Sequence, residues 1–586
     1  MHDLHRFLVD YDIAMLRALA QNRGIALATN RKTEAADHLA TALLEPVSVS
    51  TALAHLSPQA RDALELVLAS GGRMRAPHFA RRFGRVRPMG PGRLERETPW
   101  KDPANPTEEL WYAGLVFFAF FKDRAGPGEF ICVPQDLLPL LPQPQGEPLS
   151  FSVEAVPPAA YQAKLDESGS AFVEDLFAYL VYLQTHDVRP YADGRLGRRD
   201  LARIRGRLLD ADGRRLIFLR HLAQSLGLVV RQGEALRLEA TTARQWLISS
   251  PARQLAALQV GWREDPTWND LCRVPALVCD QEPRWQQRHD PVMTRKSLLA
   301  LLARVPPDAW WTLDSFLRAV KDFHPDFQRP DGDYTSWYIR DAASGEYLAG
   351  FESWERVEGA LITDLFIGAL RWLGVVATSQ AAAVSEGVQP ILCRLTESGA
   401  RLLASLPQAE QPEGQAQSDA EPEELPPPPI QVGADFSVKV PSPANLYTRF
   451  QLERFADLES TQPCRYTLTV RGLSRALARG IQVEQVLAFL QQASETAIPA
   501  NVAGQLRLWA GRFGQVELEE VAVLKVKNER VLRELSVLPS TQPLLGQVLS
   551  PTMALVPRRN LPRLRKALAE LGFLLSPPAD PVEDPS

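Results

Sequence analysis

The chain has 586 residues, enough for about three to five ordinary domains, and 45% of them are hydrophobic, so several buried cores can form. The formal net charge is −5 and the pI is about 6.1, which excludes the global basic excess of a dedicated nucleic-acid coat protein. Any contact with nucleic acid must therefore come from local patches.

The cysteines and the apolar segments indicate in which cellular compartment the protein is expected. The five cysteines are odd in number and scattered, which favours a reducing cytoplasm over a disulfide framework. Cys272 and Cys279 lie seven residues apart without a further Cys or His pair to complete a zinc site, so we interpret them as ordinary thiols. The N-terminus lacks the apolar core of a secretory signal, and no run of roughly 18 apolar residues predicts a membrane span. We expect a cytoplasmic protein without membrane contact.

Residues 1–45 predict two helices joined by a glycine turn at Gly24 and a polar loop. Thr29 and Asn30 precede the second helix and are good N-caps. The pattern resembles a SAP motif, a small helix-loop-helix that binds DNA, and the resemblance makes Lys32 a candidate DNA contact. The alternative is a helical hairpin that packs on the next domain.

Three segments then repeat one pattern, over 46–145, 159–262 and 290–406. In each, a helix ends near a Gly-Leu or Leu-Gly pair, and an apolar strand, a polar turn and a second strand follow. The copies of this helix-and-hairpin pattern begin at Thr107, Arg214 and Gly359. The pattern is similar to the back half of a winged helix, the third helix followed by a β-hairpin wing. Tandem winged helices imply a protein that handles nucleic acid or assembles partners, and they speak against a metabolic enzyme.

The first and third repeats offer little positive charge on the expected third helix. In the first repeat that helix, TEELWYAGL, is acidic and is expected to repel DNA, whereas the segment over 81–101 is basic, rich in glycine and predicted to be a mobile loop. A helix is expected over 57–69, beginning at Ser57-Pro58. In the third repeat the corresponding helix is mostly apolar, and Trp311, Phe316 and Phe366 are expected in its core.

The second repeat carries the clearest basic surface. On the helix before its third helix, Arg199, Arg203 and Arg207 lie four residues apart, opposite an apolar stripe. The candidate DNA-binding residues of the second repeat are Arg198, Arg199, Arg203, Arg207, Arg214, Arg215 and Arg220. The alternative is a solvated helix pair whose charge is balanced by Asp200, Asp210 and Asp212.

The segment over 407–430 has six acids, no Lys or Arg, and many Pro and Gln residues. Such a sequence cannot bury enough apolar surface to fold, so it predicts an acidic, disordered linker. Beyond it, strand-like runs alternate with helical patterns over 431–575, which indicates a mixed α/β domain. The overall fold class expected is therefore multidomain and mostly α, with small β wings and a C-terminal mixed α/β domain.

The C-terminal domain opens with a strand, IQVGADFSVKV; a strand and short helix follow in YTLTVRGLSRALARG, and a strand leads into a basic helix in MALVPRRNLPRLRKALAELGF. This order resembles the helicase-associated domain at the N-terminus of XPB-type DNA helicases. The resemblance implies a fold more than a function, because its motifs are apolar and turn patterns. Arg558, Arg559 and Arg563 form a second candidate DNA surface, with an ordinary charged surface as the alternative.

A helicase motor is absent from this sequence. The pair Gly-Lys, which a phosphate-binding loop requires, does not occur, and no strand ends in the Asp-Glu of a Walker B motif. No other catalytic constellation is recognisable, and no cofactor or metal is expected. We therefore expect a non-catalytic DNA-binding protein with low sequence specificity and a separate helicase or nuclease partner. The alternatives are a protein-assembly scaffold and a transcriptional regulator.

Overall fold

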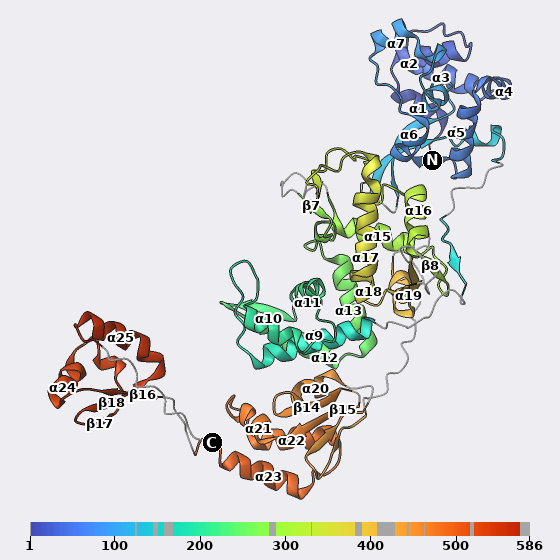
Figure 1. Ribbon diagram of the computed structural model, residues 1–586. Helices are drawn as coiled ribbons and strands as arrows, with labels where there is room; N and C mark the ends of the chain where they lie inside the picture. Colours follow the sequence, from blue (N-terminus) through green and yellow to red (C-terminus); the bar gives the residue numbers. More distant parts are fainter. Residues whose placement is uncertain are drawn as a thin grey trace. The chain divides into compact units, whose positions relative to one another are not determined.

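The computed structural model describes residues 2–123, 126–144, 151–157, 168–279, 289–329, 331–380, 390–406, 428–441, 445–461, 463–515 and 521–574. Met1–Pro428 and Pro443–Glu453 form one unit, and Pro429–Ser442 and Arg454–Ser586 form a second. Helices take 52% of the chain and strands 14%, in several small antiparallel sheets (Figure 1). These proportions confirm the predicted fold class. The predicted linker over 407–430 lies almost wholly outside the described residues.

The first unit begins with α1 (Leu4–Asp10), α2 (Ile13–Asn22) and α3 (Lys32–Leu43). The predicted caps of α3 are wrong, because Arg31 occupies the N-cap position without a side-chain hydrogen bond. Asn30 instead accepts a hydrogen bond from Arg17. Buried leucines of α2 and α3 share a core with Tyr112 and Phe117 of the first repeat. The hairpin therefore packs on the next domain, and Lys32 is exposed.

The first repeat builds a three-stranded sheet of order β1-β3-β2 among its helices. Ser57 caps α5 as predicted, with Pro58 in the first turn. The prediction of a mobile loop over 81–101 is wrong, because this segment forms α7 and η1, which bury Leu94 and Trp100. The elements are α4 (Pro46–His55), α5 (Pro58–Ala69), β1 (Arg73–Arg75), α6 (Ala76–Phe83), α7 (Pro91–Glu97), η1 (Pro99–Lys101), α8 (Pro106–Tyr112), β2 (Phe117–Asp123), β3 (Gly126–Cys132) and η2 (Leu138–Leu140).

The second repeat has the same order of elements. Val188, between the first two helices, forms a bridge to Leu236 and so joins the hairpin as a short third strand. The elements are α9 (Ser168–Thr185), α10 (Arg198–Arg205), α11 (Gly213–Ser225), β5 (Val229–Gln232) and β6 (Ala235–Leu238), followed by α12 (Ala240–Ile248) and α13 (Pro251–Glu264). Because α10 ends at Arg205, Arg207 lies in the turn after the helix and not on the helix as expected.

The third repeat again places a hairpin beside an earlier strand, in a sheet of order β10-β11-β8-β4. The expected core is present, since the rings of Trp311, Phe316 and Phe366 contact one another. The elements are β4 (Ala155–Val156), η4 (Leu271–Arg273), β7 (Leu277–Cys279), α15 (Pro291–Leu302), β8 (Trp310–Thr312), α16 (Leu313–Phe323), β9 (Ile339–Asp341), η5 (Phe351–Ser353), η6 (Glu355–Gly359), α17 (Ala360–Ile367), α18 (Ala369–Trp372), β10 (Val376–Gln380), β11 (Ile391–Leu395) and α19 (Glu397–Ala404). One large core spans the second and third repeats.

A short helix beyond the linker, α20 (Leu446–Leu452), belongs to the first unit. Phe450 joins the large core, and Arg449 donates to Glu174 of α9 at 2.7 Å. The helix ends at Leu452, and the chain turns into a strand at Ala456.

The second unit contains two sheets with helices, as the alternating pattern predicted. The first sheet has the order β12-β13-β15-β14 and the second the order β16-β18-β17 (Figure 1). Its elements are β12 (Gln431–Val432), β13 (Ser437–Lys439), β14 (Ala456–Thr461), β15 (Cys464–Leu468), α21 (Val470–Leu477), α22 (Val483–Ser494), α23 (Ala500–Gly511), β16 (Val521–Lys525), α24 (Glu529–Val537), η7 (Gln542–Leu544), β17 (Val548–Ser550), β18 (Met553–Pro557), η8 (Arg558–Asn560) and α25 (Leu561–Glu570).

Candidate nucleic-acid interface

The helix α10 and the turn after it carry an exposed basic surface of the first unit. Ile204 is buried and Leu201 packs on the large core, so the arginines of this helix face outward. The exposed arginines of this surface are Arg198, Arg199, Arg203, Arg205 and Arg207. We call these five residues the α10 surface. Among the described residues, no carboxylate lies within ion-pairing distance of any of them.

The three aspartates that were expected to balance this charge are engaged elsewhere. Asp200 accepts a hydrogen bond from the hydroxyl of Tyr182 at 2.7 Å. Asp212 caps α11 by accepting the backbone N–H of Arg215, and Asp210 accepts the backbone N–H of Asp212. These donors are neutral, so the three carboxylates keep their charge and lower the local positive potential without forming a direct ion pair with the exposed arginines.

The helix α11, in contrast, does not offer the basic face expected of it. Arg215 is buried and forms an ion pair with Asp175, so this candidate is wrong as a surface contact. Arg214 donates to both carboxylate oxygens of Asp364 at 2.6 Å. Arg220 donates to the carbonyl oxygen of Gly194 at 2.8 Å. All three guanidinium groups therefore have partners within the protein, and the buried Arg215 requires its partner because an unpaired buried charge is costly.

Aromatic side chains also cover one face of α11. The ring of Phe218 lies 5.2 Å from Trp268 and 5.7 Å from Trp372 of α18, centroid to centroid. The large apolar side chain that α11 does expose is Ile217, at 48%. A helix that enters the major groove needs a polar, open face. With its arginines engaged and its aromatic face covered, α11 lacks such a face.

The acidic third helix of the first repeat, α8, is also neutralised internally. Glu108 is fully buried and accepts hydrogen bonds from the guanidinium of Arg87 at 2.7 and 2.8 Å. Glu109 accepts from the backbone N–H and the hydroxyl of Ser57. The two carboxylates therefore hold the repeat together, and the expected repulsion of DNA by α8 is weaker than the sequence suggests.

We predict a pH dependence from Glu108. Burial acts to raise the pKa of this carboxyl, but hydrogen bonds from the Arg87 side chain and from the backbone of Ala104 and Arg87 outweigh it and hold the pKa below its ordinary value. The stabilisation is therefore fully present above the unfolded pKa of about 4.3 and is lost as the pH falls through the lower folded value. Urea unfolding between pH 6 and 3 should show Glu108→Gln to be less stable than the native chain by about 1.5–3 kcal/mol at pH 6, with the difference shrinking in acid. Parallel curves at every pH would contradict this.

The second unit carries its own basic surface around η8 and α25. Leu564, Ala567 and Leu568 are buried, and the outward positions are basic. Residues 521–574 contain nine Lys and Arg residues against three Glu and no Asp, although the whole chain is acidic. The exposed cations here are Arg558, Arg559, Arg563, Arg565 and Lys566. We call these five residues the α25 surface.

The position of these arginines on α25 is unfavourable for the helix itself. Arg558, Arg559 and Arg563 lie at or just before its N-terminus, where the helix dipole disfavours positive charge. Asn560 occupies the N-cap position without a side-chain cap. The N–H of Leu561 donates to the carbonyl oxygen of Arg558 and Pro562 has no N–H, so a phosphate would be attracted here by the arginine side chains and not by the helix terminus. Stability of the helix alone does not explain this arrangement.

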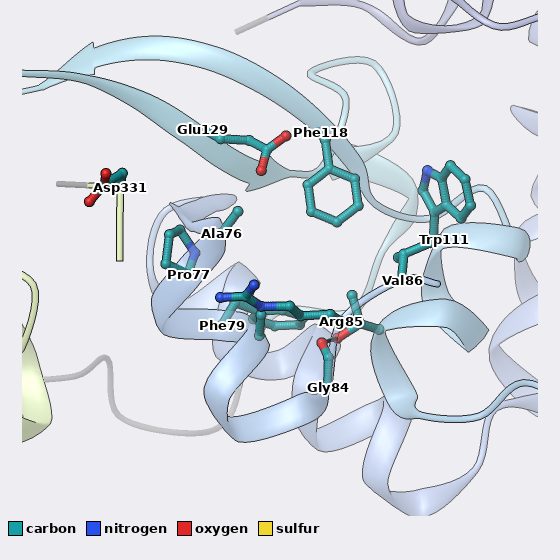
Figure 2. Close-up of a pocket in the computed structure, with 12 residues that line it drawn as sticks. Ala76, Pro77, Phe79, Gly84, Arg85, Val86, Trp111, Phe118, Glu129 and Asp331 are labelled. Carbon is teal, nitrogen blue, oxygen red and sulfur yellow. Dashed lines mark hydrogen bonds between the residues drawn. The ribbon is translucent and has the colours of Figure 1, made fainter. Parts of the chain in front are cut away.

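A cavity of about 350 Å³ lies in the first repeat between α6, α8 and the hairpin β2–β3 (Figure 2). Its apolar walls are Phe79, Trp111 and Phe118. Arg85 and Glu129 lie on opposite sides of the open space, with Asp331 at its edge (Figure 2). The cavity has room for one large side chain or a small heterocycle, and the carboxylates at its rim disfavour phosphate.

Among the described residues, no three His, Cys, Asp or Glu side chains cluster as a metal site. Within the same part of the chain, no helix is long and apolar enough to cross a membrane.

The partners of the arginines were missed at the level of sequence. Asp175 and Asp364 lie 40 and 150 residues from Arg215 and Arg214. The signal for Asp175 was its place in the otherwise apolar helix over 171–185, where an acid is rarely left unpaired. No comparable signal pointed to Asp364.

Comparison with known proteins bears on the second unit. Residues 430–550 match the family described as helicase conserved C-terminal domain, which covers about a fifth of the chain. This match supports the predicted helicase-associated domain and a helicase-related role. It ends before Arg558, so the α25 surface lies outside the matched region. A search of curated proteins found no significant match.

Proposed function

We propose that this protein is a non-catalytic DNA-binding protein that works beside a separate helicase or nuclease. The observation that carries the proposal is the α10 surface, five exposed arginines whose neighbouring aspartates are bound elsewhere. The helicase-type match of residues 430–550 and the α25 surface support it independently. The lack of a Gly-Lys pair supports the absence of a motor, and the cysteine pattern supports a cytoplasmic location.

The topology supports the interpretation of the repeats as winged helices. A winged helix places helix, strand, two helices and a hairpin in that order, with the first strand beside the last one. The sheet orders β1-β3-β2 and β10-β11-β8 follow this rule, and the bridge from Val188 to Leu236 follows it in the second repeat. The resemblances of the second unit to XPB-type proteins and of the N-terminal hairpin to a SAP motif remain part of the same proposal, with Lys32 exposed for contact.

The mode of binding follows from which arginines are accessible. Since α11 presents no accessible basic face, the arginines of the α10 and α25 surfaces would bind DNA phosphates. No side chain of α11 would reach base edges in the major groove. Phosphate contacts carry little sequence information, and their strength falls steeply with salt because counterions are released. We therefore expect similar affinities for unrelated sequences of equal length.

The test is fluorescence anisotropy of the full chain with labelled duplex, forked and single-stranded DNA across a salt series. If both surfaces engage about five phosphates in total, the logarithm of the association constant should fall with the logarithm of salt concentration with a slope of about −4 to −5 on duplex DNA. A chain that binds none of the three DNA forms at low salt would refute the proposal.

A second candidate, a protein-assembly scaffold, is favoured by specific observations. Phe218 of α11 packs against Trp372 and not toward solvent, and the cavity in Figure 2 has apolar walls with Arg85, Glu129 and Asp331 around it. If the protein is a scaffold, charge reversal on the α10 surface would leave its binding to a partner protein unchanged. Loss of DNA binding without loss of a co-purifying helicase or nuclease would show that both functions coexist.

A further inference from the structure

The cysteines differ sharply in their surroundings. Cys132 and Cys393 are buried, whereas Cys272 is exposed and Cys279 is partly exposed. Burial raises the pKa of the Cys132 thiol to about 12, and it raises the pKa of Cys393 further. Thiols in such surroundings are inert, because the thiolate is the nucleophile. Cys132 and Cys393 can therefore serve as unreactive references when the reactivity of the other cysteines is measured.

Cys272 and Cys279 lie together although they belong to different elements. Cys272 is in η4, and Cys279 ends β7, which packs against η4. A side-chain hydrogen bond from Cys279 to Cys272 links the two residues. The sequence suggested two ordinary thiols, and the structure makes them a contacting pair.

The site around Cys272 is open, and Arg273 places one positive charge near the thiol. Cys272 lines a cavity of about 320 Å³ whose walls include Trp268 and Trp372. The guanidinium of Arg273 lies 4.5 Å from the centre of the Trp268 ring, which holds this charge beside the thiol. The hydrogen bond from Cys279 lowers the pKa of Cys272, burial opposes this, and the charge of Arg273 adds to the lowering. The cavity admits hydrogen peroxide and small organic hydroperoxides.

We propose that Cys272 and Cys279 form a redox-active dithiol in which a hydroperoxide oxidises Cys272 and Cys279 closes a reversible disulfide. In the first step the Cys272 thiolate attacks one peroxide oxygen; an S–O bond forms, the O–O bond breaks, and the alkoxide or hydroxide leaves and takes up a proton. The sulfur is oxidised to sulfenic acid and the peroxide is reduced to alcohol or water. In the second step the Cys279 sulfur attacks the Cys272 sulfur, the S–S bond forms, the S–O bond breaks, and water leaves with the Cys279 proton.

This inference does not depend on DNA binding. The cavity lies between α11 and α17, since Arg214 and Asp364 also line it. In a reducing compartment the disulfide would be transient, as oxidation-sensing disulfides are.

The experiment is brief treatment of the reduced full chain with stoichiometric hydrogen peroxide, followed by alkylation, trypsin digestion and mass spectrometry. The expected product joins the tryptic peptides over 264–273 and 274–284, which contain Cys272 and Cys279. Dithiothreitol should reverse the link. In the native state, alkylation of Cys272 should be at least about tenfold faster than that of Cys132 or Cys393, and faster than that of the partly exposed Cys464.

Two variants separate the roles of the cysteines. Cys279→Ser should leave a sulfenic acid on Cys272 that a dimedone probe traps, whereas Cys272→Ser should give neither the disulfide nor the probe adduct at Cys279. Serine is tolerated at the exposed Cys272, so far-ultraviolet circular dichroism should be unchanged. Overturning results would be a disulfide that joins other cysteines first, equal reactivity of Cys272 and Cys464, or no link between Cys272 and Cys279 after full consumption of peroxide.

Discussion

Reversal of Arg199, Arg203 and Arg207 to glutamate is expected to weaken binding of duplex DNA at least about a hundredfold at low salt. All three side chains are exposed, and none has a carboxylate partner among the described residues. Each would exchange a phosphate contact for a repulsion. The slope of log affinity against log salt should become shallower by about 2.7, because three fewer counterions would be released. Fluorescence anisotropy over a salt series measures both quantities.

The matched control reverses three other exposed arginines of the first unit, Arg61, Arg96 and Arg318. This variant undergoes the same change in net charge, so it reports any effect of overall repulsion. At about 0.1–0.15 M salt it should change affinity less than about threefold, since exposed charges farther away than the Debye length of about 8–10 Å are screened. Equal losses in both triple variants would mean that the α10 surface is not the contact. Full affinity in the Arg199, Arg203 and Arg207 variant would move the interface to the α25 surface.

Local chain chemistry predicted a good part of this fold. The Ser-Pro start of α5, the helix-and-hairpin order of the repeats and the alternation beyond the linker follow from caps and periodicity, which are properties of neighbouring residues. The errors lie where tertiary burial outweighs local preference. The glycine-rich segment over 81–101 forms helices because Leu94 and Trp100 reach a core.

The candidate site was only partly predictable for a related reason. An arginine has the same appearance in a sequence whether it faces solvent or a buried acid. Arg199 and Arg203 were located correctly on the surface, whereas Arg215 was not, because its partner Asp175 lies 40 residues away on another helix. Charge periodicity indicates which side of a helix is polar, but not what covers that side. The closure of α11 by Trp372 is a long-range contact of this kind.

Replacement of Asp175 by alanine is expected to lower the free energy of unfolding of the first unit by about 3–5 kcal/mol, because it leaves the Arg215 guanidinium buried without its charge partner. Asp175 also accepts the backbone N–H of Leu209 at 2.6 Å, so the turn that carries Arg207 loses a support. Urea unfolding monitored by tryptophan fluorescence should show the shift, since Trp268 and Trp372 pack on α11 through Phe218.

The double variant Asp175→Leu with Arg215→Met decides between a structural and a DNA-binding role for Arg215. Removal of both charges leaves an apolar pair, which should recover much of the stability lost in Asp175→Ala. If Arg215 is structural, the double variant should bind DNA within about twofold of the native chain, while the reversal of Arg199, Arg203 and Arg207 should not. A double variant that is stable but has lost DNA binding would return Arg215 to the interface and would require α11 to open in the complex. Retained binding would restrict the contact of the second repeat to α10 and its turn, where phosphate and not base sequence is within reach.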